Sequence, residues 1–280
     1  MLVNKNLTNY QILALENGYK IESIQNIVLK RDDVNAHQAG LYTGKIHAQY
    51  QNKKWSQVIE PWLFEYQNLK FILKQGKSHH IGVFPEQSSN WDWLEKQCQN
   101  YPDAKVLNLF AYTGGASFAC AQAGATEVVH VDALKSAVEW AKENAKINQL
   151  ENHHIRYIVE DARKFVQREV KRHRQYEGIV LDPPSFGRGP KGQIWKLEED
   201  LKPLLESLMP LLKEQGRFLV LNTYSPDFPK EKVESILHEV LEKHGLPVHT
   251  KAYDLGFKVQ NTDALLNQGQ TVRWCYDENN

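Results

Sequence analysis

Residues 103–280 alternate short apolar runs with longer segments of helical periodicity, and this alternation constrains the fold more than any other feature of the sequence. Strand–helix units repeated at this length are typical of a parallel, doubly wound α/β sheet. Such a sheet binds ligands at the carboxyl ends of its strands. The predicted strands lie at 105–110, 127–131, 155–159, 176–181 and 216–222, with two short closing strands near 248–253 and 271–276. The predicted helices lie at 134–149, 162–173, 197–212 and 230–243.

The first 75 residues have a different pattern. Short runs rich in Ile, Val, Tyr and Trp are separated by turn-like stretches, which indicates a small β-rich N-terminal module. Its runs are 21–30, 44–50, 55–62 and 69–73, and residues 51–54 are expected to form a hairpin turn. The sequence therefore predicts a β-rich module at 1–75 that helps to position the substrate, a linker and active-site lip at 76–100, and the α/β domain at 101–280.

Composition narrows the class of protein. The chain is 41% hydrophobic and 24% charged, as in ordinary globular proteins, and no apolar run is long enough to span a membrane. The first residues lack the pattern of a signal peptide, and three scattered cysteines favour neither disulfides nor zinc. We expect a cytoplasmic protein without a metal. The net charge is zero, so nucleic-acid binding would need a local basic patch.

Polar or glycine-rich elements follow four of the predicted strands. A turn with Gly114 and Gly115 follows the first strand, where glycines let the backbone approach a ligand and leave amides directed at it. Asp132 ends the second strand and is placed to accept hydrogen bonds from ribose hydroxyls. Asp161 ends the third strand and suits the amine of an adenine ring, and Asp182 ends the fourth. All four fall on one edge of the predicted sheet.

Each element has a simpler interpretation when it is taken alone. Asp132 and Asp161 both precede helices, where an aspartate is often a cap. Their coincidence at one edge favours a functional site. A dinucleotide-dependent oxidoreductase is the natural rival, but the turn at 112–118 lacks the three glycines of G-x-G-x-x-G that pyrophosphate requires.

These motifs resemble a known family. The segments 106–115, 130–132, 160–162 and 181–186 are similar to the class I S-adenosylmethionine-dependent methyltransferases that modify bases of bacterial large-subunit rRNA. They are similar in particular to the family that includes the cytosine-C5 and guanine-N7 methyltransferases of 23S rRNA. The resemblance covers about residues 80–226. It implies a Rossmann-like, seven-stranded methyltransferase sheet in which the last hairpin supplies an antiparallel strand.

The resemblance also implies S-adenosyl-L-methionine as the cofactor. The stretch 82–87 resembles a motif on the cofactor side that precedes the catalytic domain of that family. The expected cofactor-binding residues are Phe84, Glu86, Gln87, Asn108, Phe110, Tyr112, Thr113, Gly114, Gly115, Ser117, Asp132, Ala133, Asp161, Ala162 and Asp182.

The sequence departs from the family at one point. Members that methylate cytosine C5 use a cysteine nucleophile after the fifth strand, and residues 221–226 contain none. A nitrogen target remains, since the Asp182 side chain and the Pro183 carbonyl can accept hydrogen bonds from an amino group. Phe186 either stacks on a flipped base or packs in the core. The expected catalytic residues are Asp182, Pro183, Pro184, Phe186 and Tyr224.

Two further segments carry positive charge. The basic segment 163–174 overlaps the predicted helix 162–173, which presents Lys164, Arg168 and Lys171 on one face that either contacts RNA or is simply solvated. The glycine-rich loop 187–192 is expected to close over substrate, with Trp195 as its anchor.

The leading hypothesis is a methyltransferase of a nitrogen in a base of ribosomal or other RNA, with large-subunit rRNA as partner. A methyltransferase of a small molecule or protein and a non-catalytic cofactor-binding subunit are the alternatives. The sequence does not predict the oligomeric state.

Overall fold

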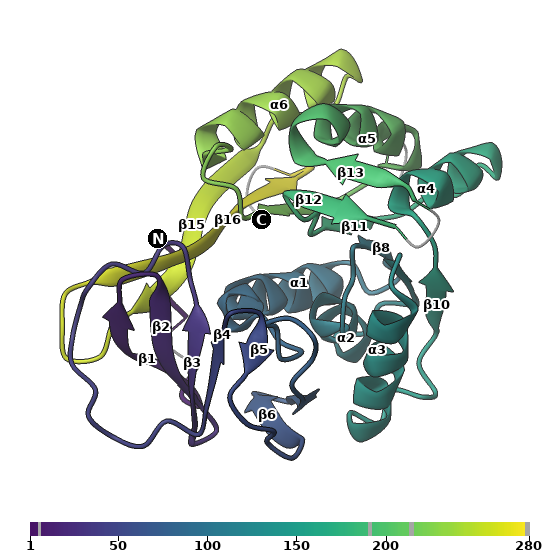
Figure 1. The fold of residues 1–280 in the computed structure, drawn as a ribbon. Coiled ribbons are helices and arrows are strands. Elements are labelled where there is room, and N and C mark those ends of the chain that lie inside the picture. Colours follow the sequence, from purple (N-terminus) through teal and green to yellow (C-terminus); the bar gives the residue numbers. More distant parts are fainter. Residues whose placement is uncertain (5–6, 190–191, 213–215, 278–280) are drawn as a thin grey trace. The chain divides into compact units, whose positions relative to one another are not determined.

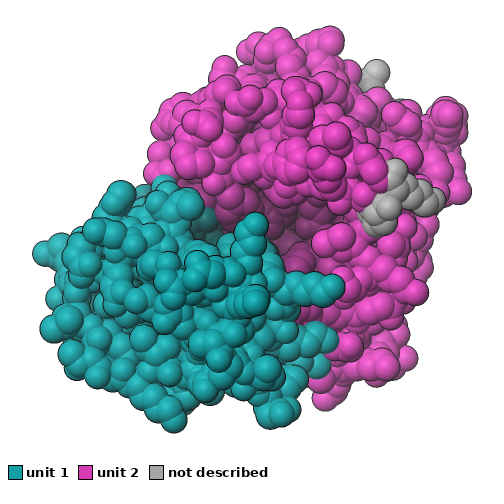
Figure 2. All heavy atoms as spheres, viewed as in Figure 1, with its two compact units in different colours: residues 1–89, 255–268 teal, residues 90–254, 269–280 magenta. Residues whose placement is uncertain are grey.

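The computed structural model describes residues 1–4, 7–189, 192–212 and 216–277. The chain forms two compact units: unit 1 contains residues 1–89 and 255–268, and unit 2 contains residues 90–254 and 269–280 (Figure 2). The β-rich region therefore includes a C-terminal hairpin that the sequence had assigned to the α/β domain. The segment predicted as a linker contains helix α1, Ser88–Asn100, most of which belongs to unit 2.

A seven-stranded sheet forms the centre of the α/β domain, in the strand order β10-β9-β8-β11-β14-β16-β15. The first five strands of this order run parallel, and β16 pairs antiparallel with β14, as the family resemblance implied. The predicted α/β fold class is confirmed. The strands are β8 Lys105–Leu109, β9 Glu127–Asp132, β10 Ile155–Val159, β11 Gly178–Leu181, β14 Phe218–Thr223, β15 Thr250–Lys258 and β16 Leu265–Cys275.

Helices cover both faces of this sheet (Figure 1). Helices α4, α5 and α6 share one hydrophobic core with side chains such as Leu107, Val129 and Leu219. Helices α1, α2 and α3 lie on the opposite face, where α2 and α3 contact β8, β9 and β10. The remaining bounds are α2 Gly115–Gln122, α3 Lys135–Ile147, α4 Ala162–Lys171, α5 Leu197–Leu212 and α6 Lys230–Lys243.

Burial on both faces explains the composition of the central strands. Every residue of β11 and β14 is buried, so these strands are continuous apolar runs rather than alternating ones. The closing strands β15 and β16 are longer than predicted, because each continues beyond unit 2 into unit 1.

Unit 1 contains a five-stranded sheet, β1 to β5, and a separate hairpin of β6 and β7. The run at 21–30 contains parts of two strands, β2 and β3. Gln25 and Asn26 have φ values of 49° and 67° and turn the chain between β2 and β3, a left-handed conformation that suits a two-residue hairpin loop. The strand predicted at 55–62 is also interrupted, whereas the hairpin turn at 51–54 is confirmed. The bounds are β1 Tyr10–Glu16, β2 Tyr19–Ile24, β3 Ile27–Asp32, β4 Ala48–Gln51, β5 Lys54–Trp55, β6 Trp62–Tyr66 and β7 Leu69–Leu73.

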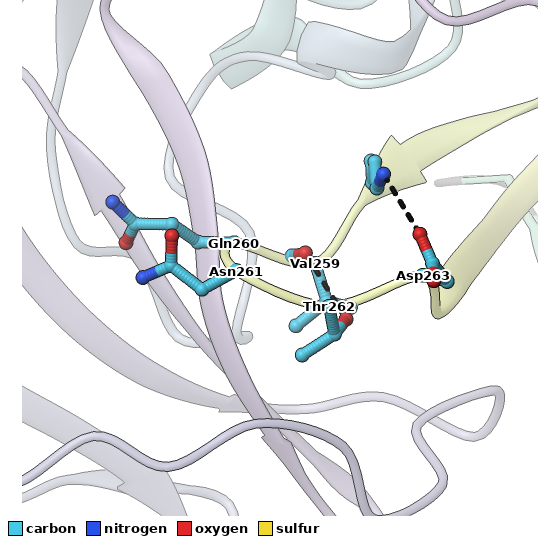
Figure 3. Close-up of a pocket in the computed structure, with 6 residues that line it drawn as sticks. Val259, Gln260, Asn261, Thr262 and Asp263 are labelled. Atoms are coloured by element: carbon cyan, nitrogen blue, oxygen red, sulfur yellow. Dashed lines mark hydrogen bonds and ion pairs between the residues drawn. The ribbon is translucent and has the colours of Figure 1, made fainter.

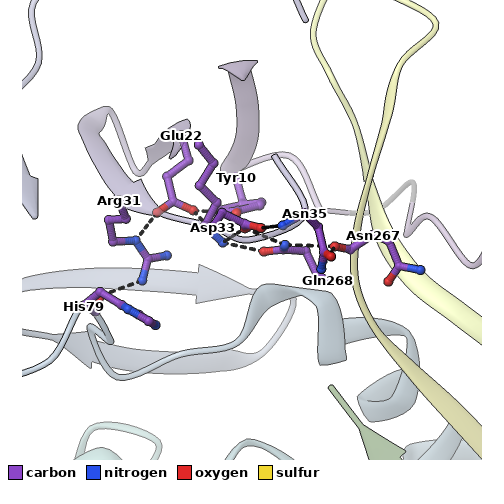
Figure 4. Close-up of polar contacts among 9 residues, drawn as sticks. Tyr10, Glu22, Arg31, Asp33, Asn35, His79, Asn267 and Gln268 are labelled. Atoms are coloured by element: carbon purple, nitrogen blue, oxygen red, sulfur yellow. Dashed lines mark hydrogen bonds and ion pairs between the residues drawn. The ribbon is translucent and has the colours of Figure 1, made fainter. Parts of the chain in front are cut away.

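A buried polar network crosses unit 1 (Figure 4). Glu22 is fully buried, pairs with Arg31 and accepts a 2.6 Å hydrogen bond from the Tyr10 hydroxyl. Burial alone would raise the pKa of Glu22, but Arg31 and Lys20 outweigh it and bring the pKa to about 2. The Arg31 guanidinium also donates to the His79 carbonyl at 2.8 Å, so the network ties β2 and β3 to the segment before α1.

Candidate active site

The glycine-rich turn after β8 is held in an unusual backbone conformation. Phe110, Tyr112 and Gly114 have φ values of 58°, 48° and 104°. A Cβ atom on Gly114 would lie 2.3 Å from the ring of Phe118, so no larger residue fits there. Gly114 begins α2 without a side-chain cap, which leaves the positive end of the helix available to an anionic group.

Two predicted cofactor residues lie beneath this turn. The Asn108 Nδ2 donates to Ser117 Oγ at 2.9 Å, and Ser117 Oγ is 3.0 Å from Nδ1 of His130. All three side chains are buried. Burial lowers the pKa of His130 to about 3, so its ring is neutral at physiological pH. These side chains fix α2 on β8 and β9, and the contact between His130 and Ser117 could not be predicted because it joins two different elements.

Asp132 ends β9 at the same edge as the turn. Its Oδ2 accepts from the Tyr112 backbone N–H at 2.9 Å, and its Oδ1 accepts from the Leu134 N–H at 2.8 Å. Burial raises the pKa of Asp132, although these two hydrogen bonds oppose the change. Each carboxylate oxygen has two lone pairs, so both retain capacity for a hydroxyl donor.

Asp161 caps helix α4, which was the simpler of the two interpretations of this residue. Its Oδ1 accepts from the Lys164 backbone N–H at 3.2 Å at the start of α4, and its Oδ2 lies 3.4 Å from Arg163. Arg163 also pairs with Asp200 at 2.7 Å. The carboxylate is thus held at the edge after β10, and its contact with an adenine amine stays a prediction. Beside these carboxylates, Ala162 is buried and Ala133 is half-buried.

Asp182 follows β11 at the centre of this edge. Its Oδ1 is buried and has no hydrogen-bond partner among the described residues. Burial raises the pKa of Asp182 to about 6, hydrogen bonds from Tyr224 and Asn222 oppose the rise, and the nearby Asp132 adds to it. An unpartnered buried carboxylate oxygen is costly and often marks a place that a ligand fills.

A short hairpin follows Asp182-Pro183-Pro184. Its strands are β12, Phe186–Arg188, and β13, Ile194–Lys196. Phe186 is 55% exposed, so core packing, the alternative considered for it, is wrong. Trp195 is buried and donates from Nε1 to the Pro184 carbonyl at 2.7 Å, so it anchors the hairpin as predicted. Pro190 and Lys191 of the predicted closing loop lie outside the described residues.

Tyr224 follows β14 and lies beside Gly269 of β16. A Cβ atom on Gly269 would be 2.9 Å from the Tyr224 ring, so the glycine makes room for the aromatic side chain. Asp132 and Tyr224 both act on the pKa of Asp182, so these three side chains lie near one another at this edge.

Three predicted cofactor residues belong to unit 1. Glu86 and Gln87 are buried in a 3₁₀ turn, Pro85–Gln87, and the Phe84 ring centroid lies 5.2 Å from that of His80. Their role in cofactor binding stays a prediction. A pocket in unit 1 is lined by residues 258–263 of the hairpin between β15 and β16, and none of the predicted site residues lines it (Figure 3).

The cations on and around α4 are mostly paired. Arg163 pairs with Asp200, Arg168 with Glu160, and Arg174 with Glu127. Of the three side chains predicted on one face of this helix, Arg168 has an ion pair, and the choice between a solvated face and one that contacts RNA stays a prediction. Within the described ranges, no group of His, Cys, Asp and Glu has the arrangement of a metal site. In the same part of the chain, no helix is long and apolar enough to cross a membrane.

A seven-stranded sheet with a glycine-rich turn and carboxylates along one edge defines a Rossmann-like enzyme that uses a nucleoside-containing cofactor. A family model described as S-adenosylmethionine-dependent methyltransferase matches residues 51–244. The chain belongs to this family, and its cofactor is S-adenosylmethionine.

Solved and curated relatives agree with the family. A methyltransferase structure from Agrobacterium tumefaciens, described as dependent on S-adenosylmethionine, has a TM-score of 0.91 and 31% identity, covering 99% of this chain and 93% of the other. Ribosomal RNA large subunit methyltransferase I of Tolumonas auensis is 29% identical over 74% of this chain and 50% of its own length. Ribosomal RNA large subunit methyltransferase K/L of Shewanella frigidimarina is 35% identical over 42% of this chain and 16% of its own length. The chain thus spans half or less of the length of these curated relatives.

The residues of unit 2 fit the cofactor. Asp132 is a fixed acceptor with spare lone pairs, and the start of α2 has no side-chain cap. Both lie at the edge where Asp182 has an unpartnered oxygen. These observations match S-adenosylmethionine, which has ribose hydroxyls as donors, a methionine carboxylate and a methyl group that is directed at the methyl acceptor.

Proposed function

We propose that this methyltransferase modifies a nitrogen of an RNA base, with large-subunit rRNA as the substrate. The observation that carries the proposal is the buried, unpartnered Oδ1 of Asp182. This oxygen is suited to accept a hydrogen bond from a base amino or imino group. Support for RNA comes from the relatives that act on rRNA of the large subunit. A cytoplasmic location follows from that substrate.

We assign cofactor binding to the edge of the sheet. The Asp132 carboxylate accepts from ribose hydroxyls, the start of α2 faces the carboxylate of the methionine moiety, and Asp161 with Ala162 borders the adenine. Phe110, Tyr112, Thr113 and Gly115 contribute backbone around the turn. Asn108 and Ser117 act indirectly, because their side chains bind each other beneath it.

In the proposed reaction, Asp182 and the Pro183 carbonyl orient the target nitrogen so that its lone pair faces the methyl group. S-adenosylmethionine supplies that methyl on a positively charged sulfur. As the new carbon–nitrogen bond forms, the bond between the methyl group and the sulfur breaks, and S-adenosylhomocysteine leaves with that electron pair. The nitrogen loses a proton, which the Asp182 carboxylate accepts. Alignment of the two reacting atoms supplies much of the acceleration. Tyr224 and Pro184 form walls of the acceptor pocket, and the exposed Phe186 stacks on RNA.

A covalent route through cysteine is disfavoured by the state of the thiols. Cys98, Cys120 and Cys275 are all buried. A hydrogen bond with Cys98, together with burial, raises the pKa of Cys120, and burial raises the pKa of Cys275 to about 11. Cys120 and Cys275 are therefore poor nucleophiles, because the thiolate is the reactive form.

Unit 1 has a part in this proposal. We assign the β-rich module at 1–75 to RNA positioning, residues 76–100 to the lip of the active site and residues 101–280 to methyl transfer. A small-molecule or protein acceptor is a second candidate, because the chain has zero net charge and spans only part of its curated relatives.

The test measures methyl transfer from S-adenosylmethionine with a tritiated methyl group. Total RNA, a metabolite extract and protein are taken from a strain that lacks the gene and incubated with the enzyme. Label in RNA, with mass mapping to a nitrogen of one base, is the expected result. Label confined to metabolites or protein would reject the RNA assignment. The Asp182→Ala variant is expected to bind cofactor and transfer no label, and transfer by that variant at the wild-type rate would reject the role of Asp182.

A further inference from the structure

Three polar side chains form a row across the sheet of unit 2: those of Asp182, Asn222 and Thr271. Asn222 of β14 lies in register with Thr271 of β16, and Asp182 follows the residue of β11 that pairs with Leu221. Asn90 of α1 packs over the row. Its Nδ2 donates to Asn222 Oδ1 at 3.0 Å and to Thr271 Oγ1 at 3.2 Å. Asn90, Asn222 and Thr271 are all at least 98% buried.

Arg273 determines the direction of every hydrogen bond in the row. Its Nε donates to Asn90 Oδ1 at 2.8 Å, and a guanidinium has donors only. The Asn90 oxygen must therefore face Arg273, so its NH₂ group faces Asn222. That contact requires the Asn222 oxygen, so the NH₂ group of Asn222 is left to donate elsewhere. Asp182 lies next to Asn222 in the strand register, and hydrogen bonding from Asn222 acts to lower the pKa of Asp182, which fits a donor directed at its carboxyl group.

The direction of this series of hydrogen bonds matters at Asp182. Hydrogen bonding from Asn222 and Tyr224 lowers the pKa of the Asp182 carboxyl group, and Oδ1 has no partner among the described residues, so both donors are assigned to Oδ2. Donors on Oδ2 stabilise the charged form, and they also prevent the carboxyl group from rotating. Oδ1 is then presented to the acceptor in a single orientation.

We propose that Arg273, Asn90 and Asn222 are positioning residues that hold Asp182 charged and oriented, so that its Oδ1 receives the hydrogen of the acceptor nitrogen. This inference deepens the proposed function and rests on the role given there to Asp182. The other groups in unit 2 that act on the Asp182 carboxyl are Tyr224, which donates to it, and Asp132, whose charge opposes its ionisation.

The decisive variants change Asn90 without touching the carboxylate. In Asn90→Asp the new side chain still accepts from Arg273 but cannot donate to Asn222. Asn222 must then turn over and present its oxygen to Asp182, which disfavours the charged form. Asn90→Leu removes the donor without adding charge. Asn100→Asp is the matched control, because it adds the same charge at an exposed site on the same helix.

The readout is the titration of Asp182 by NMR on protein labelled with ¹³C at the aspartate carboxyl, with Asp182→Asn for assignment. We expect a midpoint near 6 in the wild type. We expect a rise of about one pH unit or more in Asn90→Asp and Asn90→Leu, and no change in Asn100→Asp. An unchanged or lower midpoint in Asn90→Leu would overturn the inference even if Asn90→Asp shifts, since a shift in the latter alone is a charge effect.

A measurement on the wild-type protein covers the case in which the variants fail to fold. The side-chain NH₂ resonances of Asn222 are expected to titrate with the same midpoint as Asp182, because that group donates to its carboxylate. A flat response would overturn the inference. None of these measurements needs an acceptor. If RNA receives no methyl group while the titrations give the expected midpoints, the proposed function is wrong. The positioning role of Arg273, Asn90 and Asn222 is then still supported.

Discussion

The indole Nε1 of Trp195 donates a 2.7 Å hydrogen bond to the carbonyl oxygen of Pro184. The Trp195 ring also lies 5.0 Å from that of Phe110. The exposed hairpin of β12 and β13 is thereby fastened to the Asp182-Pro183-Pro184 segment on one side and to the turn after β8 on the other.

Trp195→Phe should loosen this attachment while it retains an aromatic ring. The lost hydrogen bond is expected to lower the stability by about 1 kcal/mol and to lower kcat far more than it changes the affinity for S-adenosylmethionine. Thermal denaturation, calorimetry and label transfer measure the three quantities. Weakened cofactor binding with unchanged kcat would place the tryptophan on the cofactor side instead.

Asp132→Ala should weaken the binding of S-adenosylmethionine by ~1–3 kcal/mol, or roughly 5- to 150-fold in Kd. The substitution removes an acceptor and also releases the N–H groups of Tyr112 and Leu134 that shape the edge. Isothermal calorimetry measures the change. Asp103→Ala is the control, because it removes an exposed carboxylate of the same unit. Equal affinity in the wild type and Asp132→Ala would contradict the ribose assignment.

Methyl transfer should fall as the pH drops through about 6, the pKa of Asp182, because only the carboxylate can accept the proton. The profile of kcat against pH measures this limb. A profile that is flat between pH 5 and 8 would remove Asp182 from the proton transfer.

The Asp182 carboxyl group is also expected to lower the free energy of unfolding at high pH. Its pKa rises from 3.8 to about 6 on folding, so its protonated form is favoured in the folded state. The cost is absent below pH 3.8, grows between pH 3.8 and 6, and reaches on the order of 3 kcal/mol above pH 6. Asp182→Asn is therefore expected to gain stability relative to the wild type as pH rises from 4 to 8. Denaturant titrations at both pH values provide the comparison, and a constant difference would argue against the raised pKa.

Phe186→Ala should weaken RNA binding and leave both the melting temperature and the cofactor affinity unchanged, because the ring is mostly exposed. Loss of one stacked base corresponds to ~1–3 kcal/mol. Gel-shift or anisotropy measurements with rRNA fragments give the affinity. Tyr276→Ala, which removes another exposed aromatic ring of unit 2, is the control and should bind RNA like the wild type.

Local patterns in the sequence were enough to predict the central sheet and the edge that carries the candidate site. The runs that became β8, β9, β11 and β14 are almost wholly buried on both faces, so hydrophobicity alone marks them. The edge strand β10 is only partly buried and was still recognisable as an apolar run. Turn chemistry was harder, since Gln25 and Asn26 make a tight hairpin loop without the glycine that usually signals one.

Contacts between distant residues were beyond the sequence. Asn90 and Asn222 are separated by 132 positions, and neither stands in a motif. Their roles depend on the crossing of α1 over β14, which no local pattern encodes. The same limit applies to His130, whose partner Ser117 lies on another element.

The composition of unit 1 from residues 1–89 and 255–268 has a consequence for biosynthesis. Leu2 and Ile12 form bridges with Leu255 and Val259, so the first residues of unit 1 pair with residues that lie far along the chain. A ribosome must therefore translate through residue 268 before this unit can close. Until then the first strands lack these partners, which makes slow translation of the intervening residues a hazard for folding yield.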